Sequence, residues 1–230
     1  MTKKFCLLTP GRSGSTTLIR AIGNRPGVAL PSRDISSCID DELVHPARLR
    51  QTSKAYEALV GRPIPDGNAL VDTFFEVHQS DAFAGFKSMP ARHEPYESFL
   101  RTEGLHFIVL TRDDLPSLVA SFHVAKRRGT WRREGEEHEF RWRFTRDQIP
   151  GLRATTEYVR RSVELLKQVP NPIWIRYEDL VSPGFQCIEL DAFFGSPIQI
   201  ESPKGPVSGS SYVSGWNDFQ SYVHSEMSVS

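Results

Sequence analysis

The sequence has no excess of charge of either sign, because 28 Asp and Glu residues balance its 28 Lys and Arg residues. Such a balance provides no overall field to attract DNA, RNA or an anionic membrane, so a nucleic-acid-binding function is disfavoured. Long hydrophobic runs are lacking too, and the apolar stretch at 5–8 is too short for a signal-peptide core. We therefore expect neither a nucleic-acid partner nor a membrane span.

Cysteine is scarce. The three cysteines, Cys6, Cys38 and Cys187, are an odd number, and no two of them are close in sequence. Neither a disulfide framework nor a metal-binding CxxC pair is expected, and no cluster of His, Cys or carboxylate residues has the spacing of metal ligands. These absences favour a reducing, cytoplasmic location and a site without metal.

The remaining composition is that of a globular domain, with 39% hydrophobic and 24% charged residues in a chain of 230. Short apolar runs that end in turn residues predict buried strands at 5–8, 69–75, 83–87, 106–111 and 172–177. Helices are expected at 15–22, after 113, and at 149–169, where apolar residues recur every three to four positions.

This alternation predicts an α/β fold: a three-layer arrangement in which helices cover both faces of a parallel sheet. We expect one domain over 1–230, with insertions at 40–67 and 131–148. The C-terminal segment 201–230 contains four aromatic residues, too many for a disordered tail, so it should dock onto the domain.

A loop rich in glycine and hydroxyl side chains, Thr9-Pro-Gly-Arg-Ser-Gly-Ser-Thr-Thr, lies between the first strand and the first helix. Backbone N–H groups and the helix dipole attract an anion at such a position. Arg12 adds a permanent charge, and the candidate ligand groups are those of Arg12, Ser13, Gly14, Ser15, Thr16 and Thr17. The loop lacks the spacing and the lysine of a Walker A motif. The alternative is a tight turn with Ser15 as helix cap.

This strand, loop and helix resemble the element with which sulfotransferases bind the 5′-phosphosulfate of 3′-phosphoadenosine-5′-phosphosulfate (PAPS). A second stretch, from Phe107 through Arg112 to Ser121, resembles the family's segment that holds the 3′-phosphate with an arginine and a serine. Ser117 lies on the same face of that helix as Ser121. Either serine can therefore hold the phosphate.

Further stretches resemble the family in the same order along the chain. Gly85-Phe86-Lys87 is similar to a family strand end, 176–180 to its Tyr-Glu-Asp-Leu junction, and 212–219 to a late aromatic segment. Residues 121–131 resemble bacterial carbohydrate sulfotransferases of the trehalose 2-sulfotransferase type. The resemblance implies a P-loop-like nucleotide-binding fold, PAPS as donor, 3′,5′-ADP as product, and a hydroxyl of a small molecule or carbohydrate as acceptor.

The resemblance also suggests catalytic roles. Arg12 would stabilise the transferring sulfonate, Lys87 would steady the sulfonate or the acceptor, and Lys204 would close over the 3′-phosphate. The family's base is a glutamate after the first helix, and Asp34 stands near that place here. Asp34 is equally well interpreted as a helix N-cap, and His78 is the rival base.

Two other functions stay open at the level of sequence. A non-catalytic nucleotide-binding protein would keep the loop but lack the base, since no glutamate occupies its place and Gly215 replaces an asparagine of the late segment. A P-loop kinase is the weaker alternative, because the Walker lysine is missing.

Overall fold

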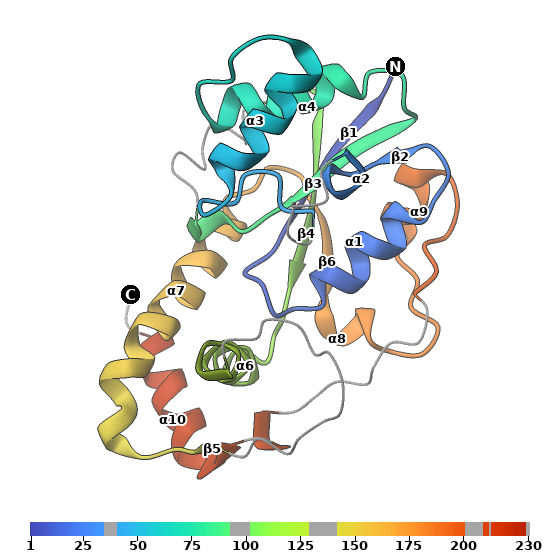
Figure 1. The fold of residues 1–230 in the computed structure, drawn as a ribbon. Helices are drawn as coiled ribbons and strands as arrows, with labels where there is room; N and C mark the ends of the chain where they lie inside the picture. Colours follow the sequence, from blue (N-terminus) through green and yellow to red (C-terminus); the bar gives the residue numbers. More distant parts are fainter. Residues whose placement is uncertain (35–40, 93–101, 129–141, 201–208, 212, 229–230) are drawn as a thin grey trace.

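The fold is built on a parallel sheet of five strands in the order β2-β3-β1-β4-β6 (Figure 1). The computed structural model describes residues 1–34, 41–92, 102–128, 142–200, 209–211 and 213–228. The strands are β1 (Lys3–Leu8), β2 (Val28–Ala29), β3 (Phe83–Ser88), β4 (Leu105–Thr111) and β6 (Ile173–Arg176). Because all five run the same way, the loops that leave β1, β3 and β4 meet at one edge, the carboxyl edge.

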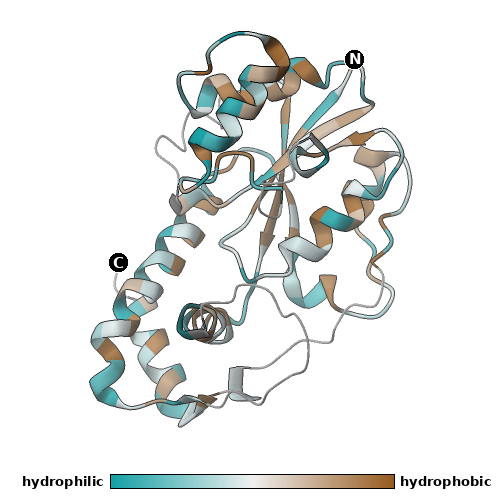
Figure 2. Ribbon diagram, viewed as in Figure 1, coloured by the Kyte–Doolittle hydropathy of each residue, from teal (hydrophilic) through white to brown (hydrophobic). Residues whose placement is uncertain are grey.

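Helices cover both faces of the sheet, as the alternation of elements predicted. One face packs against α3 (Leu49–Val60), α4 (Gly67–Val77) and the end of α7 (Ile149–Lys167). The other face packs against α1 (Ser15–Gly23), α8 (Tyr177–Leu180) and α9 (Ile188–Phe194). Alternate residues of β1 belong to the two cores, Phe5 and Leu7 to the second and Cys6 and Leu8 to the first, as the pleat of a strand requires. Figure 2 shows the apolar strands between the helical layers.

A third core lies beyond the carboxyl edge. It joins α6 (Leu115–Arg128), the start of α7 and α10 (Trp216–Met227), and it includes residues of the two-stranded sheet of β5 (Trp142–Arg143) and β7 (Val213–Ser214). Short elements complete the described chain: α2 (Pro31–Asp34), η1 (Pro90–Arg92), η2 (Arg146–Gln148) and η3 (Gly209–Ser211). No helix of the described residues is both long and apolar enough to cross a membrane.

The predicted strand at 69–75 is wrong, because these residues form most of α4. The Asp66 side chain accepts a hydrogen bond from the Ala69 amide at 2.9 Å and so caps the helix. Leu70, Phe74 and their neighbours face the first core at helical spacing. An unbroken apolar run is ambiguous between strand and helix, and the capping aspartate decides the outcome here.

The structure describes parts of the two predicted insertions and of the predicted C-terminal segment. The segment at 40–67 contains α3, whose Tyr56 is fully buried in the first core. Of the segment at 131–148, residues 131–141 lie outside the described part of the chain. Near the C-terminus, Phe219 and Val223 of α10 are fully buried against α6 and α7. The last helix is thus an integral part of the third core.

Candidate functional site

The loop after β1 is held by bonds within itself. Gly11, Arg12 and Gly14 adopt φ angles of 88°, 54° and 80°, a region that glycine enters freely and other residues enter at a cost. The hydroxyls of Thr9 and Ser13 lie 2.5 Å apart, and the Gly11 amide donates to the Thr9 hydroxyl at 3.1 Å. The Ser13 side chain therefore belongs to the buried frame of the loop, directly before the first turn of α1, where N–H groups have no partner inside the helix.

Side chains from three other elements contact this loop. The Tyr158 hydroxyl of α7 donates to the Pro10 carbonyl at 3.2 Å. A Cβ added to Gly11 would lie 3.0 Å from the Phe122 ring of α6 and 3.2 Å from the Met89 sulfur, just after β3. The loop is thus enclosed on several sides, which fixes its shape before any ligand binds.

Arg12 joins the loop to α6. Its Nε donates to the Ser121 hydroxyl at 3.0 Å, although the two residues are 109 positions apart in the chain. Ser117, one turn earlier on α6, is fully buried and its hydroxyl accepts the Gly209 amide at 2.8 Å. Of the two serines, Ser121 therefore lies at the loop, whereas Ser117 fastens η3 to α6.

Arg112 follows β4 directly and is buried, with 6% of the residue exposed. Its guanidinium carbon lies 4.6 Å from the centre of the Tyr177 ring. A Cβ at Gly14 would lie 3.1 Å from Tyr177 and from Leu180. The Tyr177 ring therefore contacts both the loop before α1 and Arg112. The loop that carries Arg12 and the side chain of Arg112 thus pack against the same aromatic ring.

Lys87 ends up on the same face of the sheet as α1. It pairs with Leu7, which packs in the core beneath α1, and residues paired across parallel strands point to the same face. The Lys87 amide donates to the Asp41 carbonyl at 2.8 Å, and Glu42 pairs with Lys87 in an isolated parallel bridge. Glu42 and Lys87 are only 2% and 1% exposed. An acidic and a basic side chain are therefore buried on one face at the carboxyl edge.

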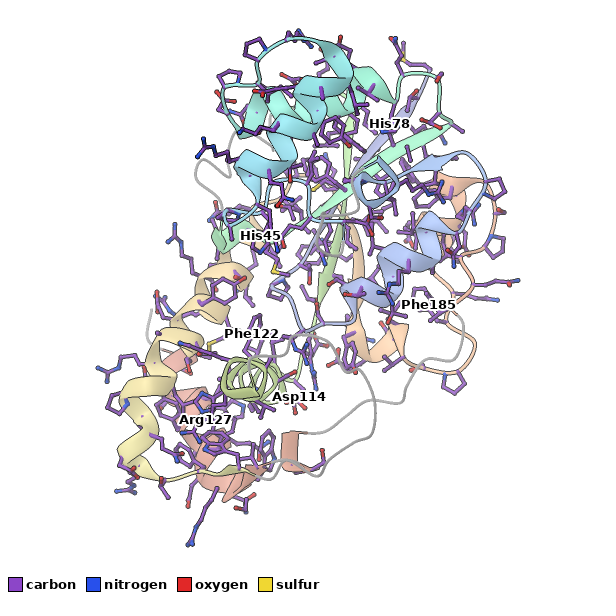
Figure 3. All side chains as sticks on the ribbon, viewed as in Figure 1. His45, His78, Asp114, Phe122, Arg127 and Phe185 are labelled. Carbon is purple, nitrogen blue, oxygen red and sulfur yellow. The ribbon has the colours of Figure 1, made fainter. Side chains whose placement is uncertain are left out.

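His78 lies at the other end of the sheet. It follows α4 and precedes β3, and its Nδ1 is 2.8 Å from an Asp81 carboxylate oxygen. In the view of Figure 3, His78 lies at the opposite end of the molecule from Phe122 and Asp114. The structure thus separates His78 from the loop, from Arg112 and from Lys87.

For some of the other predicted site residues, the structure describes the backbone but not the side chain, or does not describe the residue. Asp34 is the last residue of α2, and its side chain lies outside the described part of the chain, as do residues 35–40. Lys204 falls in 201–208, which is also outside it. Ser15 is buried in the first turn of α1, Thr16 is half-buried and Thr17 is exposed.

A histidine on α6 lies away from the site. His123 packs on Trp142 with ring centroids 4.5 Å apart, and neither ring nitrogen has a hydrogen-bond partner among the described residues. Burial, together with the nearby charges of Arg127 and Lys126, lowers the pKa of His123 from 6.5 to about 4. Two residues along a helix are about 200° apart, so His123 faces the third core while Ser121 faces the loop.

Sequence reasoning missed Glu42 and assigned no role to Tyr177 or Glu178. Glu42 becomes visible only when the chain returns to pair with Lys87, a contact that no local pattern announces. The 176–180 junction did stand out in the sequence, but its contacts with Arg112 and with the turn before α6 depend on the neighbouring strand. Within the described chain, no group of three or more His, Cys, Asp or Glu side chains could hold a metal ion.

Comparisons with known proteins show a similarity to a solved structure. No family model matches the chain, and no curated protein matches it in sequence. Among solved structures, the chain is similar to a sulfotransferase domain from the curacin biosynthetic pathway, with a TM-score of 0.48 and 16% sequence identity. The similarity covers 92% of this chain and 83% of that one. At this identity and TM-score, it does not establish a shared activity.

Proposed function

We propose that the protein transfers a sulfonate from PAPS to a hydroxyl group of a small-molecule or carbohydrate acceptor. The observation that carries this proposal is the 3.0 Å hydrogen bond between Arg12 and Ser121. It brings together the two elements that resemble the two ends of a PAPS site, although they lie far apart in sequence. A chance likeness in either stretch alone would not require them to meet.

The residues present suit a ligand with a phosphate at each end. The end of the loop, from Arg12 to Gly14, leads into the N-terminus of α1, where backbone amides can bind one anionic group. Buried Arg112 offers a guanidinium that can donate two parallel hydrogen bonds to another. The Tyr177 ring lies 4.6 Å from the guanidinium carbon of Arg112, within the range of a cation–π contact.

When bound, PAPS supplies an activated sulfonate whose leaving group is 3′,5′-ADP. Arg12 and the loop amides would stabilise the negative charge that develops on the bridging and peripheral oxygens as the bond to the phosphate breaks. Lys87, on the α1 face of the carboxyl edge, would hold the sulfonate from the other side. The acceptor oxygen forms the new bond to sulfur and must lose its proton to a base.

Two carboxylates are candidates for that base. The resemblance suggests Asp34, which is the last residue of α2. The helix α2 follows the end of β2 closely in sequence. Glu42 is the residue that the structure adds, because it is buried beside Lys87 at that edge. His78 does not take part in the proposal, since it lies at the opposite edge. Assignment to the trehalose type remains a prediction.

The proposal is tested by isothermal calorimetry in the presence of EDTA. Wild-type protein should bind 3′,5′-ADP and PAPS and bind ATP more weakly, because the Walker lysine that would serve a metal-bound triphosphate is missing. ATP binding at least as tight as that of 3′,5′-ADP, or loss of binding with the chelator, would overturn the nucleotide assignment. Release of 3′,5′-ADP from PAPS only when a hydroxyl acceptor is added separates an enzyme from a binding protein.

A further inference from the structure

The short helix α8 contacts the turn that carries Arg112. The two carboxylate oxygens of Glu178 accept the backbone amides of Asp113 and Asp114, each at 3.3 Å. These are the two residues directly after Arg112 and directly before α6 (Leu115–Arg128). The carboxylate therefore grips the backbone between the end of β4 and the start of α6.

Neighbouring residues of α8 support the same region from a second direction. The Tyr177 ring lies 4.6 Å from the Arg112 guanidinium carbon, and its edge abuts Gly14. Arg176, immediately before α8, pairs with Asp179 at 2.7 Å and reaches Asp113 at 3.5 Å. One turn of helix thus contacts the side chain of Arg112, the backbone that follows it and the loop before α1.

Elementary electrostatics explains why a carboxylate suits this place. The first amides of α6 lack partners inside the helix and carry partial positive charge. Glu178 satisfies two amides of this turn at once, and hydrogen bonds to a charged acceptor are stronger than neutral ones. Since the turn is only two residues long, any shift of its backbone would move Arg112 as well.

We propose that Glu178 is a positioning residue for Arg112: it fixes the turn that sets where the guanidinium meets the second anionic group of the ligand. The inference rests on the proposed function, because it assumes that Arg112 binds the 3′-phosphate. A role confined to helix capping would make Glu178 important for folding and irrelevant to ligand choice. The two roles differ in a measurable ratio.

That ratio is the dissociation constant for 5′-AMP divided by the one for 3′,5′-ADP, which reports the contribution of the 3′-phosphate alone. In wild type it should be well above one, and Arg112→Ala should bring it close to one. Glu178→Ala should reduce it on the order of tenfold, since small misplacement of a binding group is costly. Glu178→Gln should lie between, because its amide oxygen can still accept one of the two N–H groups.

A double variant separates positioning from direct binding. If Glu178 acts only through Arg112, then Glu178→Ala should leave the ratio unchanged in the Arg112→Ala background. Glu164→Gln is the control: it also removes one negative charge, from an exposed carboxylate of α7 that pairs with Lys167 at 2.8 Å. It should keep the wild-type ratio.

The results that overturn each proposal are different. A wild-type ratio near one would refute the 3′-phosphate site, and the role of Glu178 would fall with it. A wild-type ratio well above one that survives Glu178→Ala, with a lower melting temperature, would refute positioning and leave only a cap. If Glu178→Ala does not fold, Glu178→Gln decides: an unchanged ratio in that variant counts against the proposal.

Discussion

The carboxyl edge of the five-stranded sheet, where the strands end, and its amino edge, where they begin, differ in the charged side chains that they bury. At the carboxyl edge, Glu42, Lys87 and Arg112 are all almost completely buried. At the amino edge, an open hollow of about 560 Å³ is lined by the exposed carboxylates of Asp72 and Glu76. The carboxylates around the hollow at the amino edge thus stay in contact with water, whereas the charged side chains of the carboxyl edge are removed from it.

This contrast points to the carboxyl edge as the candidate site, because its charged side chains are removed from water. Moving a charge out of water costs free energy unless partners compensate for it. A fold that buries three charges at one edge gives up stability there, and such arrangements are typical of sites that bind or transform charged ligands. The variants below test whether function follows that burial.

The largest effect is expected from removal of the base at the carboxyl edge. Glu42→Gln and Asp34→Asn keep size and hydrogen-bonding ability but remove basicity. Replacement of the residue that acts as the base should lower turnover by roughly 100-fold or more, with little change in nucleotide affinity. Steady-state rates with PAPS and an acceptor, together with calorimetry on 3′,5′-ADP, measure both quantities.

The variants Glu42→Gln and Asp34→Asn also test whether either residue has only a structural role. Full activity of Asp34→Asn would leave Asp34 a purely structural role. A fall in melting temperature of Glu42→Gln without a fall in turnover would make Glu42 a buried partner of the Lys87 strand and nothing more. If both variants keep wild-type turnover, the acceptor's proton leaves by another route and the non-catalytic alternative gains ground.

The second largest effect concerns two arginines of the carboxyl edge, Arg112 and Arg12. Arg112→Ala should mainly weaken nucleotide binding, because in the proposed function Arg112 would contact its anion in ground and transition states alike. Arg12→Ala should mainly lower turnover, because the charge of Arg12 would act on the transferring group. Each loss should be about 1.5 to 3 kcal/mol, or roughly 10- to 150-fold. Equal losses of turnover with unchanged affinity in both variants would falsify this division.

The third effect concerns His123, which is buried like Arg112 but faces the third core. Because its pKa falls from 6.5 to about 4 in the fold, the unfolded chain takes up the proton first as pH drops. His123 therefore lowers stability between about pH 6.5 and pH 4, by up to roughly 3 kcal/mol. His123→Phe should remove that loss in urea unfolding measured at pH 7 and pH 4, while turnover at pH 7 stays unchanged.

Phe144, which packs on Trp142 in the same core, provides the control for this measurement. Phe144→Leu removes an apolar contact but no titratable group, so it should lower stability by a similar amount at pH 7 and at pH 4. A wild-type pH profile in His123→Phe would show that His123 is not held neutral. A loss of turnover in the same variant would extend the functional site beyond the carboxyl edge.

The smallest effect is expected at the amino edge. His78→Gln removes the contact with Asp81 and should cost about 1 kcal/mol of stability or less. Turnover and nucleotide affinity should stay within about twofold of wild type, the scatter expected for a residue remote from the chemistry. A tenfold fall in turnover would restore His78 as the base and break the contrast between the edges.

Local pattern was enough to predict much of the fold. Four of the five predicted strands, the helix at 15–22 and the helix at 149–169 agree with the structure to within a few residues. The prediction failed at α4, where an apolar run carries no decisive period, and β2 was missed because two residues make no pattern.

The site was less accessible from sequence, for a physical reason. The loop and Arg112 stand at strand ends, which local signals reveal. The position of Glu42 depends on pairing with Lys87, and the role of Glu178 depends on β6 lying beside β4. Tertiary contacts of this kind have no counterpart in spacing along the chain, so only the folded molecule shows them.

The left-handed backbone of Arg12 sets a limit on how this protein can be stabilised. At a φ of 54°, glycine would adopt the conformation without the cost of about 1 kcal/mol or more that a side chain incurs. A search for thermostable variants would therefore select Arg12→Gly and, by the same change, discard the cation that bonds to Ser121. Engineering for heat resistance has to hold this position fixed and seek its gains elsewhere. One place is the third core, where the ring nitrogens of His123 and Trp142 have no hydrogen-bond partner among the described residues.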